Sequence, residues 1–481
     1  MTAAGAQAGV RFARRSTRGL LLGLSTPRVA VIGAAAAAAL TGFLLGGAAV
    51  FVASGLVWAP FALSAFARVA GRPAVEWAGT AVHFGARRRS GQTQFRMRVD
   101  KPRPAGTLAL PGDAASLRLH VDEISEAAMI HDPHRQTLTA VLSVSHPAFV
   151  LLDDPDRSLR VSRWGRVIAQ LAQSGTCAAL QVLEATIPDP GRSQSDWWEA
   201  HGSHDGGWAP AQYETLLQQV RLDSSVHRTT ISLSLDLHGS ARAIKVAGRG
   251  LRGAADVLRG DMACLTDSLR QAGLRPLGWL NEAALAGIVR QAFDPTVLID
   301  DLSDPAAKLA RAGPVAVSES WQRLRHDSGW SAVLWVSEWP RVTVPPDFLH
   351  PLVFTPGVLR TLSIMSRPLP TDAALRQIRR EKTAAVADSV QKSRLGQLAD
   401  LSDAQEYDDV LARERSVIAG HTDVEFTGLV TVTAPTEDAL ETAVAAITRA
   451  AGQVSCEVRP LYGQQMQGFI AAALPLARTT F

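Results

Sequence analysis

The sequence predicts an α+β protein in which an N-terminal two-helix transmembrane hairpin precedes a cytoplasmic α+β body. The hairpin is predicted by residues 29–67, which are 39 consecutive positions without Asp, Glu, Lys, Arg or His. The body is predicted by strand-like and helix-like hydrophobic patterns that alternate from about residue 106 onward. With 47% hydrophobic and 20% charged residues, the 481-residue chain can bury large cores, which argues against a mainly disordered protein.

The uncharged stretch is long enough for two membrane spans, because one spanning helix needs about 20 apolar residues. We place the spans at roughly 29–46 and 49–67, with the turn at Gly46-Gly47. Gly42 and Gly46 have the spacing that lets two helices approach closely. A cleaved signal peptide is one alternative, but its apolar region would be only about 7–15 residues long. A single buried helix is another, but several glycines and a proline would interrupt it.

The basic residues predict the orientation of the hairpin. Residues 1–103 contain 14 Lys and Arg and two acids, whereas the rest of the chain contains 35 Lys and Arg and 43 acids. Arginines flank the apolar stretch and none lies in its turn, so the positive-inside rule places both termini in the cytoplasm. We expect these arginines to contact the anionic leaflet of the cell inner membrane and not nucleic acid. The predicted anchoring residues are Arg28, Gly42, Gly46, Gly47, Arg68, Arg72, Arg87, Arg88 and Arg89.

The body reads as a series of strand–helix–strand units, an arrangement that two ferredoxin-like halves would produce. We divide the chain into a basic cytoplasmic N-terminus (1–28), the transmembrane hairpin (29–68), a basic juxtamembrane arm (69–105) and two cytoplasmic α+β subdomains (106–300 and 301–481).

Four patterns in the body are especially regular. Residues 137–153 predict paired strands, and 229–237 predicts a strand with one buried and one solvated face. Apolar residues recur every three or four positions over 251–269, which predicts a helix packed on its own sheet, with an intermolecular coiled coil as the alternative. Two polar helices are predicted at 372–398 and 403–418.

The sequence contains no recognisable catalytic or cofactor-binding motif. A P-loop requires a Gly-Lys pair, and none of the five lysines follows a glycine. The three cysteines lack a C-x-x-C spacing. His201, His204 and Asp205 resemble metal ligands, but they lie among glycines and predict an exposed loop. We therefore predict that the protein is not an enzyme and has no metal or cofactor.

Two stretches of the chain contain short motifs that resemble known families. The motifs are Val75-Glu76-Trp77-Ala78 and Arg87-Arg88-Arg89 in the N-terminal stretch, and Phe149-Val150-Leu151-Leu152-Asp153, Ser337-Glu338-Trp339-Pro340-Arg341, Ala419-Gly420-His421 and Gly468-Phe469 in the body. The N-terminal stretch is similar to conjugation and secretion membrane proteins of actinobacteria, whose two-span unit resembles the small inner-membrane subunit of type IV secretion systems. Residues 136–475 are similar to the N-terminal, non-motor half of the type IV secretion ATPase. The resemblance implies a docking and scaffold part that lacks the motor's nucleotide-binding residues.

Together these observations predict a non-enzymatic inner-membrane scaffold of a type IV-like conjugation or secretion apparatus. A separate ATPase or coupling protein would dock on the charged helix 372–398 at Arg376, Arg379 and Arg380. We expect Glu381 and Lys382 to extend this solvated charged face. Other membrane subunits are expected partners, and a homo-oligomer stays open. One alternative is the E component of a type VII secretion system. The other is a membrane-tethered metal-dependent hydrolase that uses His201, His204 and Asp205.

Overall fold

The computed structural model describes residues 25–479 except 70, 99, 101–105, 147–148, 189–191, 221–224, 298–305, 341, 395–400 and 420–421. The predicted N-terminus 1–28 lies almost wholly outside the described residues, as does the predicted boundary at 300 and 301. The fold mixes helices (52%) with an antiparallel sheet (24% strand), as the predicted class requires. The described residues divide into two compact units, 93–375 with 415–479, and 25–92 with 376–414.

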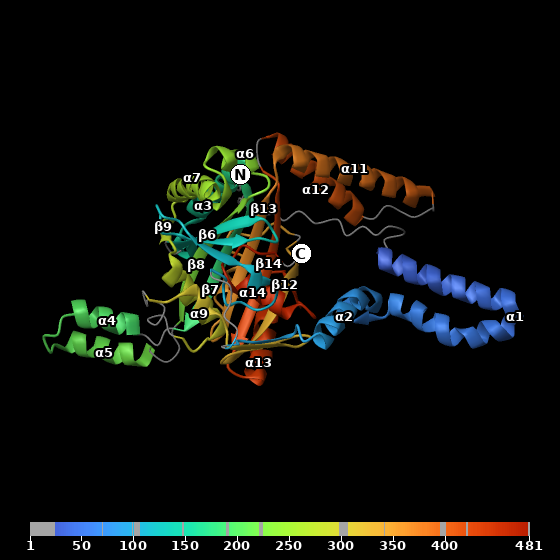
Figure 1. Cartoon of the computed structure of the whole chain (residues 1–481), viewed down its shortest axis with the longest axis horizontal. Coiled ribbons are helices and arrows are strands. Elements are labelled where there is room, and N and C mark those ends of the chain that lie inside the picture. Colours follow the sequence, from blue (N-terminus) through green and yellow to red (C-terminus); the bar gives the residue numbers. More distant parts are fainter. Residues whose placement is uncertain are drawn as a thin grey trace, which may run out of the picture. The chain divides into compact units, whose positions relative to one another are not determined.

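The larger unit is built on one antiparallel sheet of 13 strands (Figure 1). The strands are β3 (Gln94–Arg96), β4 (Arg118–Val121), β5 (Ala128–Asp132), β6 (Thr137–Ser145), β7 (Cys177–Pro188), β8 (Ser225–Asp236), β9 (Arg275–Trp279), β10 (Ala316–Glu319), β11 (Leu324–His326), β12 (Gly329–Glu338), β13 (Leu359–Pro368), β14 (Val424–Ala434) and β15 (Glu457–Pro460). Their order is β3-β10-β11-β12-β14-β13-β7-β8-β6-β5-β4, with β9 beside β6 and β15 beside β12. Because β7 pairs with β13, strands from both predicted subdomains share one sheet.

The connectivity of the sheet occurs twice. In the first half the strands lie in the order β9-β6-β8-β7, and in the second half in the equivalent order β15-β12-β14-β13. Along the chain, the strands of the first half follow as β6, β7, β8 and β9, and those of the second half as β12, β13, β14 and β15. In this chain order, helices connect the first strand to the second and the third to the fourth, and a pair of helices is inserted between the second and third. The first half contains α3 (Asp154–Ser174), the inserted pair α4 (Arg192–His201) and α5 (Trp208–Val220), α6 (Ala241–Val246) and α7 (Gly250–Gln271). The second half contains α10 (His350–Val353), the inserted pair α11 (Thr371–Arg394) and α12 (Leu401–Ile418), and α13 (Glu437–Gln453).

Helices cover both faces of the sheet. On one face, α3 and α7 pack on the first half and α10 and α13 pack on the second. On the other face lie α8 (Glu282–Phe293), α14 (Gln465–Ala473) and the segment around η1 (Gly112–Ser116). The short helix α9 (Leu309–Ala312) joins this second core.

The apolar seam at 251–269 packs on its own sheet, as predicted. It forms one face of α7, and five of its six apolar side chains are buried in the core that α7 shares with β6 and β8. Leu258 and Leu269 are 0% exposed, whereas Leu251 in the first turn is 36% exposed.

Two strand predictions in the body were wrong in part. The face of β8 predicted to be solvated is buried, because the chain after α14 crosses it: Ser232 Oγ donates to the carbonyl of Pro475 at 2.8 Å. The second strand predicted within 137–153 is instead a 3-10 turn, η2 (Phe149–Leu151). Leu151 is 85% exposed, so this apolar run does not enter the sheet.

The smaller unit contains most of α11 and α12. It also contains the long apolar helix α1 (Thr26–Phe66), followed by β1 (Arg68–Val69), β2 (Arg72–Pro73) and α2 (Ala74–Arg89). The backbone of α1 leaves helical geometry at Gly46 (φ −157°, ψ 22°) and Gly47 (φ 65°, ψ −153°). The ribbon of α1 reverses direction along its length (Figure 1), and a Cβ built at Gly42 would lie 2.5 Å from Ser54 Oγ.

A buried carboxylate between β4 and β5 makes the stability of the larger unit depend on pH. Asp122 accepts hydrogen bonds from Arg259 Nε at 3.1 Å and Nη2 at 3.0 Å, and from Ser125 Oγ at 2.6 Å. Burial alone would raise the pKa of Asp122, but these hydrogen bonds and the charge of Arg259 lower it to about 2. The ion pair therefore stabilises the fold above the ordinary pKa and loses its effect as the pH falls toward 2.

We expect Asp122→Asn to lower the free energy of unfolding at pH 7 by about 2 kcal/mol. This is the free energy that corresponds to the lowering of the Asp122 pKa on folding. The difference between wild type and variant should shrink as the pH falls from about 4 to about 2. Urea denaturation at several pH values measures it. An unchanged difference over that range would contradict the assignment.

Candidate membrane segment and docking helix

Among the described residues, one helix, α1, is long and apolar enough to cross a membrane. Its large apolar side chains are exposed, Leu45 by 79% and Leu56 by 87%. Only 11% of its most apolar window is buried, so α1 lacks the packing of a core helix in a water-soluble protein. An apolar surface of this kind requires a covering environment.

The predicted anchoring residues lie at the ends, bend and flanks of α1. Gly46 and Gly47 form the break in the helix, and Gly47 has a combination of φ and ψ that is essentially restricted to glycine. A Cβ at Gly46 would lie 2.1 Å from Val50 Cγ2. Gly42 is in contact with Ser54, as described above.

The predicted anchoring arginines differ in exposure. Arg28 lies in the first turn of α1, and Arg68 is exposed in β1. The guanidinium carbon of Arg72 lies 6.0 Å from the centroid of the Trp77 ring. The last turn of α2 carries the other three, of which Arg88 and Arg89 are exposed and Arg87 is buried. Arg87 thus departs from the prediction that all three contact lipid.

The predicted docking arginines lie on one exposed face of α11. Arg376, Arg379 and Arg380 are exposed, whereas Ala374 and Ile378 are 0% exposed on the opposite face. Two neighbouring charges that we expected on the exposed face pair with α12 instead. Glu381 accepts from Arg413 Nη1 at 2.8 Å, and Lys382 Nζ donates to Glu414 at 2.8 Å. The charged docking face is therefore narrower than predicted.

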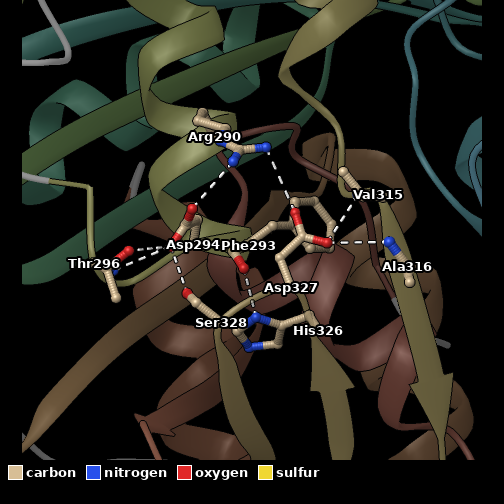
Figure 2. Close-up of polar contacts among 9 residues, drawn as sticks. All are labelled: Arg290, Phe293, Asp294, Thr296, Val315, Ala316, His326, Asp327 and Ser328. Carbon is tan, nitrogen blue, oxygen red and sulfur yellow. Dashed lines mark hydrogen bonds and ion pairs between the residues drawn. The ribbon is translucent and has the colours of Figure 1, made fainter.

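Figure 2 shows a polar cluster where the end of α8 meets β10, β11 and β12. Arg290 is 3.0 Å from Asp294 Oδ2 and 3.5 Å from Asp327 Oδ2. Asp327 Oδ1 also accepts from the backbone N–H groups of Val315 and Ala316, at 2.8 and 3.0 Å.

Both acids in this cluster, Asp294 and Asp327, already accept hydrogen bonds from neighbouring groups. Burial raises the pKa of Asp294, but hydrogen bonds from Ser328 and Thr296 and the charge of Arg290 lower it overall. Burial lowers the pKa of His326, whose Nδ1 lies 2.6 Å from the carbonyl oxygen of Phe293. The cluster joins the end of α8 to β10 and to the turn between β11 and β12, and each of its acids and its histidine already has hydrogen-bond partners.

The histidines of the predicted loop contact different partners. The ring of His201, at the end of α4, stacks on Trp197 with centroids 5.2 Å apart. His204 Nε2 lies 3.3 Å from the carbonyl oxygen of Glu199, and Asp205 accepts from the N–H of Gly207 at 3.0 Å. Within the described part of the chain, no group of three or more His, Cys, Asp or Glu residues is placed to hold a metal ion.

Sequence reasoning missed the helices α4 and α5, and it placed His201, the last residue of α4, in a loop. Helices α4 and α5 lie side by side (Figure 1). The rings of Trp198 on α4 and Tyr213 on α5 lie 4.5 Å apart. Trp208 is 79% exposed at the start of α5. The adjacent residues Trp197 and Trp198 were the available sequence signal for a packed helix at this position. The equivalence of the helix pair α4 and α5 to the pair α11 and α12 is visible only in the repeated connectivity of the sheet.

Comparisons with known proteins do not identify a family. No protein-family model matches the sequence, and no significant match to a curated protein is found. The motifs quoted above are thus the whole basis for the resemblance to secretion proteins.

Proposed function

We propose that the protein is a non-enzymatic inner-membrane scaffold of a type IV-like conjugation or secretion apparatus, anchored by α1. The observation that carries this proposal is the exposed apolar surface of α1, flanked by arginines on both sides. The body would recruit a separate ATPase, as the resemblance implies. A type VII E component stays the alternative, since it also pairs two N-terminal spans with a cytoplasmic domain.

The proposed anchor crosses the membrane twice. Each half of α1, on either side of Gly46 and Gly47, contains close to the 20 apolar residues that one span needs. The uncharged bend would lie outside, and Arg28 and Arg68 would both lie at the cytoplasmic surface. The matched strand orders support the further proposal that the body consists of two ferredoxin-like halves.

The proposed docking surface is the exposed face of α11 with Arg376, Arg379 and Arg380. Exposed charges contribute little to stability, about 0–1 kcal/mol per pair, but they can determine partner choice and association rate. An acidic surface on the ATPase would complement this face.

We expect the double variant Arg379→Glu with Arg380→Glu to retain the fold and to bind the ATPase less well. Its melting temperature should stay within a few degrees of wild type, because both side chains are exposed. Retention of a P-loop ATPase by the tagged full-length chain in membranes should fall, and more at low salt, where electrostatic attraction is strongest.

A matched control carries the same change of charge elsewhere on the body. Arg242→Glu with Arg252→Glu reverses two exposed arginines of the first half and should leave ATPase retention unchanged. Equal retention by the α11 variant and the control at every salt concentration would show that the docking surface lies elsewhere.

A further inference from the structure

A cavity of about 50 Å³ lies at the end of the sheet where β7, β8 and β13 meet α8. Its lining includes the apolar residues Ile187, Ile288 and Leu359 and the polar residues Arg228, Gln291 and Thr361. A water molecule needs about 10–15 Å³ of such space, so the cavity can hold a small ion of several atoms.

The charge around this cavity is unbalanced. Arg228 donates from Nη2 to Gln291 Oε1 at 2.8 Å, but its buried Nε has no hydrogen-bond partner. Arg360 of β13 also borders the cavity, but its side chain alternates with those of Leu359 and Thr361 and leaves the strand on the opposite face of the sheet. There its Nη1 donates to the carbonyls of Thr355 and Val358, at 3.2 and 3.3 Å, and its buried Nη2 has no partner. Among the described residues, neither guanidinium forms an ion pair within 4 Å. Burial lowers the pKa of each arginine to about 10, and the charge of Glu184 offsets this only in part.

The nearest acid is held by other groups. The carboxylate of Glu184 accepts a short hydrogen bond from Thr229 Oγ1, and His227 Nδ1 lies 3.2 Å from its Oε1. Two guanidinium groups therefore share the influence of one carboxylate that is already hydrogen-bonded. A buried cation without a full counter-charge is costly, and an oxyanion is the partner that guanidinium groups bind best.

We propose that this cavity binds a small oxyanion, a carboxylate or a phosphate group, through the Nε–H of Arg228. The position of Arg228 on β8, directly opposite Ala185 of β7, places it at the rim of the cavity. The charge of Glu184 weakens the positive potential at Arg228. The apolar lining residues would accommodate the carbon end of a short carboxylate, whereas phosphate would contact only the polar lining residues.

Equilibrium dialysis of the full-length chain in nanodiscs of neutral lipid, with radiolabelled phosphate or acetate in chloride buffer, tests the site. Wild type should bind at least one of the two probes saturably, and the tighter probe identifies the class of oxyanion. Arg228→Met should lower that affinity by at least about tenfold, because a charge-assisted hydrogen bond is lost. Arg367→Met removes an exposed arginine of β13 that pairs with Glu425 at 3.8 Å, and should leave binding unchanged.

Glu184→Gln separates binding from a merely structural role. Gln keeps an oxygen to accept from Thr229 but removes the competing negative charge, so the affinity for the oxyanion should rise several-fold. If Arg228→Met does not fold, this second variant still decides the question. Absence of saturable binding by wild type, equal binding by wild type and Arg228→Met, or unchanged affinity in Glu184→Gln would overturn the proposal.

Discussion

Leu258→Asp should unfold the larger unit. Leu258 is 0% exposed on α7, in the core that joins α7 to β6 and β8. The variant loses the contacts of a buried leucine, which costs about 2–5 kcal/mol. It also buries a carboxylate without a partner, which costs several kcal/mol more. The total approaches the full stability of a typical domain, about 5–15 kcal/mol.

Leu251→Asp is the matched control, because Leu251 belongs to the same apolar seam but is 36% exposed in the first turn of α7. Circular dichroism and limited proteolysis of the two variants measure the difference. We expect the control to keep a cooperative unfolding transition and Leu258→Asp to lack one. A folded Leu258→Asp variant would show that the seam faces a partner and not the sheet.

Gln181→Leu should cost the second largest amount of stability. Gln181 is 0% exposed on β7, and its Nε2 donates to the carbonyls of Ala471 and Leu474, at 3.0 and 3.1 Å. Its Oε1 accepts from the N–H of Ala477 at 2.7 Å. Leucine would remove these three hydrogen bonds and the one from Nε2 to Ser363 Oγ, each worth about 0.5–1.5 kcal/mol net. It would also leave the buried N–H of Ala477 without its acceptor, which costs about 1–3 kcal/mol. We expect a loss of at least about 3 kcal/mol.

Urea denaturation measures this loss, with Gln170→Leu as the control. Gln170 is an exposed residue of α3, and it accepts one hydrogen bond, from Ser268 Oγ at 2.6 Å. Its replacement should change the free energy of unfolding by less than about 1 kcal/mol. Equal losses in the two variants would mean that the chain after α14 is not held by Gln181.

The elements best predicted from the sequence are those whose patterns depend only on near neighbours. The seam of α7 and the alternation in β8 both follow from the period of the element, so their existence could be predicted. What covers β8 could not, because Ser232 is buried by Pro475, which lies 243 positions further along the chain. An alternating strand predicts a solvated polar face only if nothing from elsewhere packs on it.

In the candidate sites, too, local sequence patterns could be predicted but contacts with distant parts of the chain could not. The exposed face of α11 could be predicted from its run of arginines. The pairing of Glu381 and Lys382 away from this face could not, because their partners Arg413 and Glu414 belong to α12. Arg228 gives no signal in the sequence, since one arginine at the start of a strand usually lies at a solvated edge. Arg228 borders a cavity only because α8, which is distant in the sequence, packs against the sheet beside it.

Cysteine accessibility in intact cells tests the central proposal, a membrane anchor whose bend is external and whose body is cytoplasmic. Cys264 is exposed on α7 and serves as the native reporter of the body. Burial raises the pKa of Cys177 to about 12 and that of Cys456 to about 11, so both should react slowly. The substitution Ala48→Cys adds a second reporter thiol beside the bend, where Ala48 is exposed.

A membrane-impermeant maleimide should label the Ala48→Cys variant at its introduced thiol in intact cells and leave Cys264 unlabelled until the cells are lysed. In inverted membrane vesicles the pattern should be the opposite, with Cys264 labelled and the thiol beside the bend protected. Labelling of Cys264 in intact cells, or of both positions on the same side, would contradict the proposed topology.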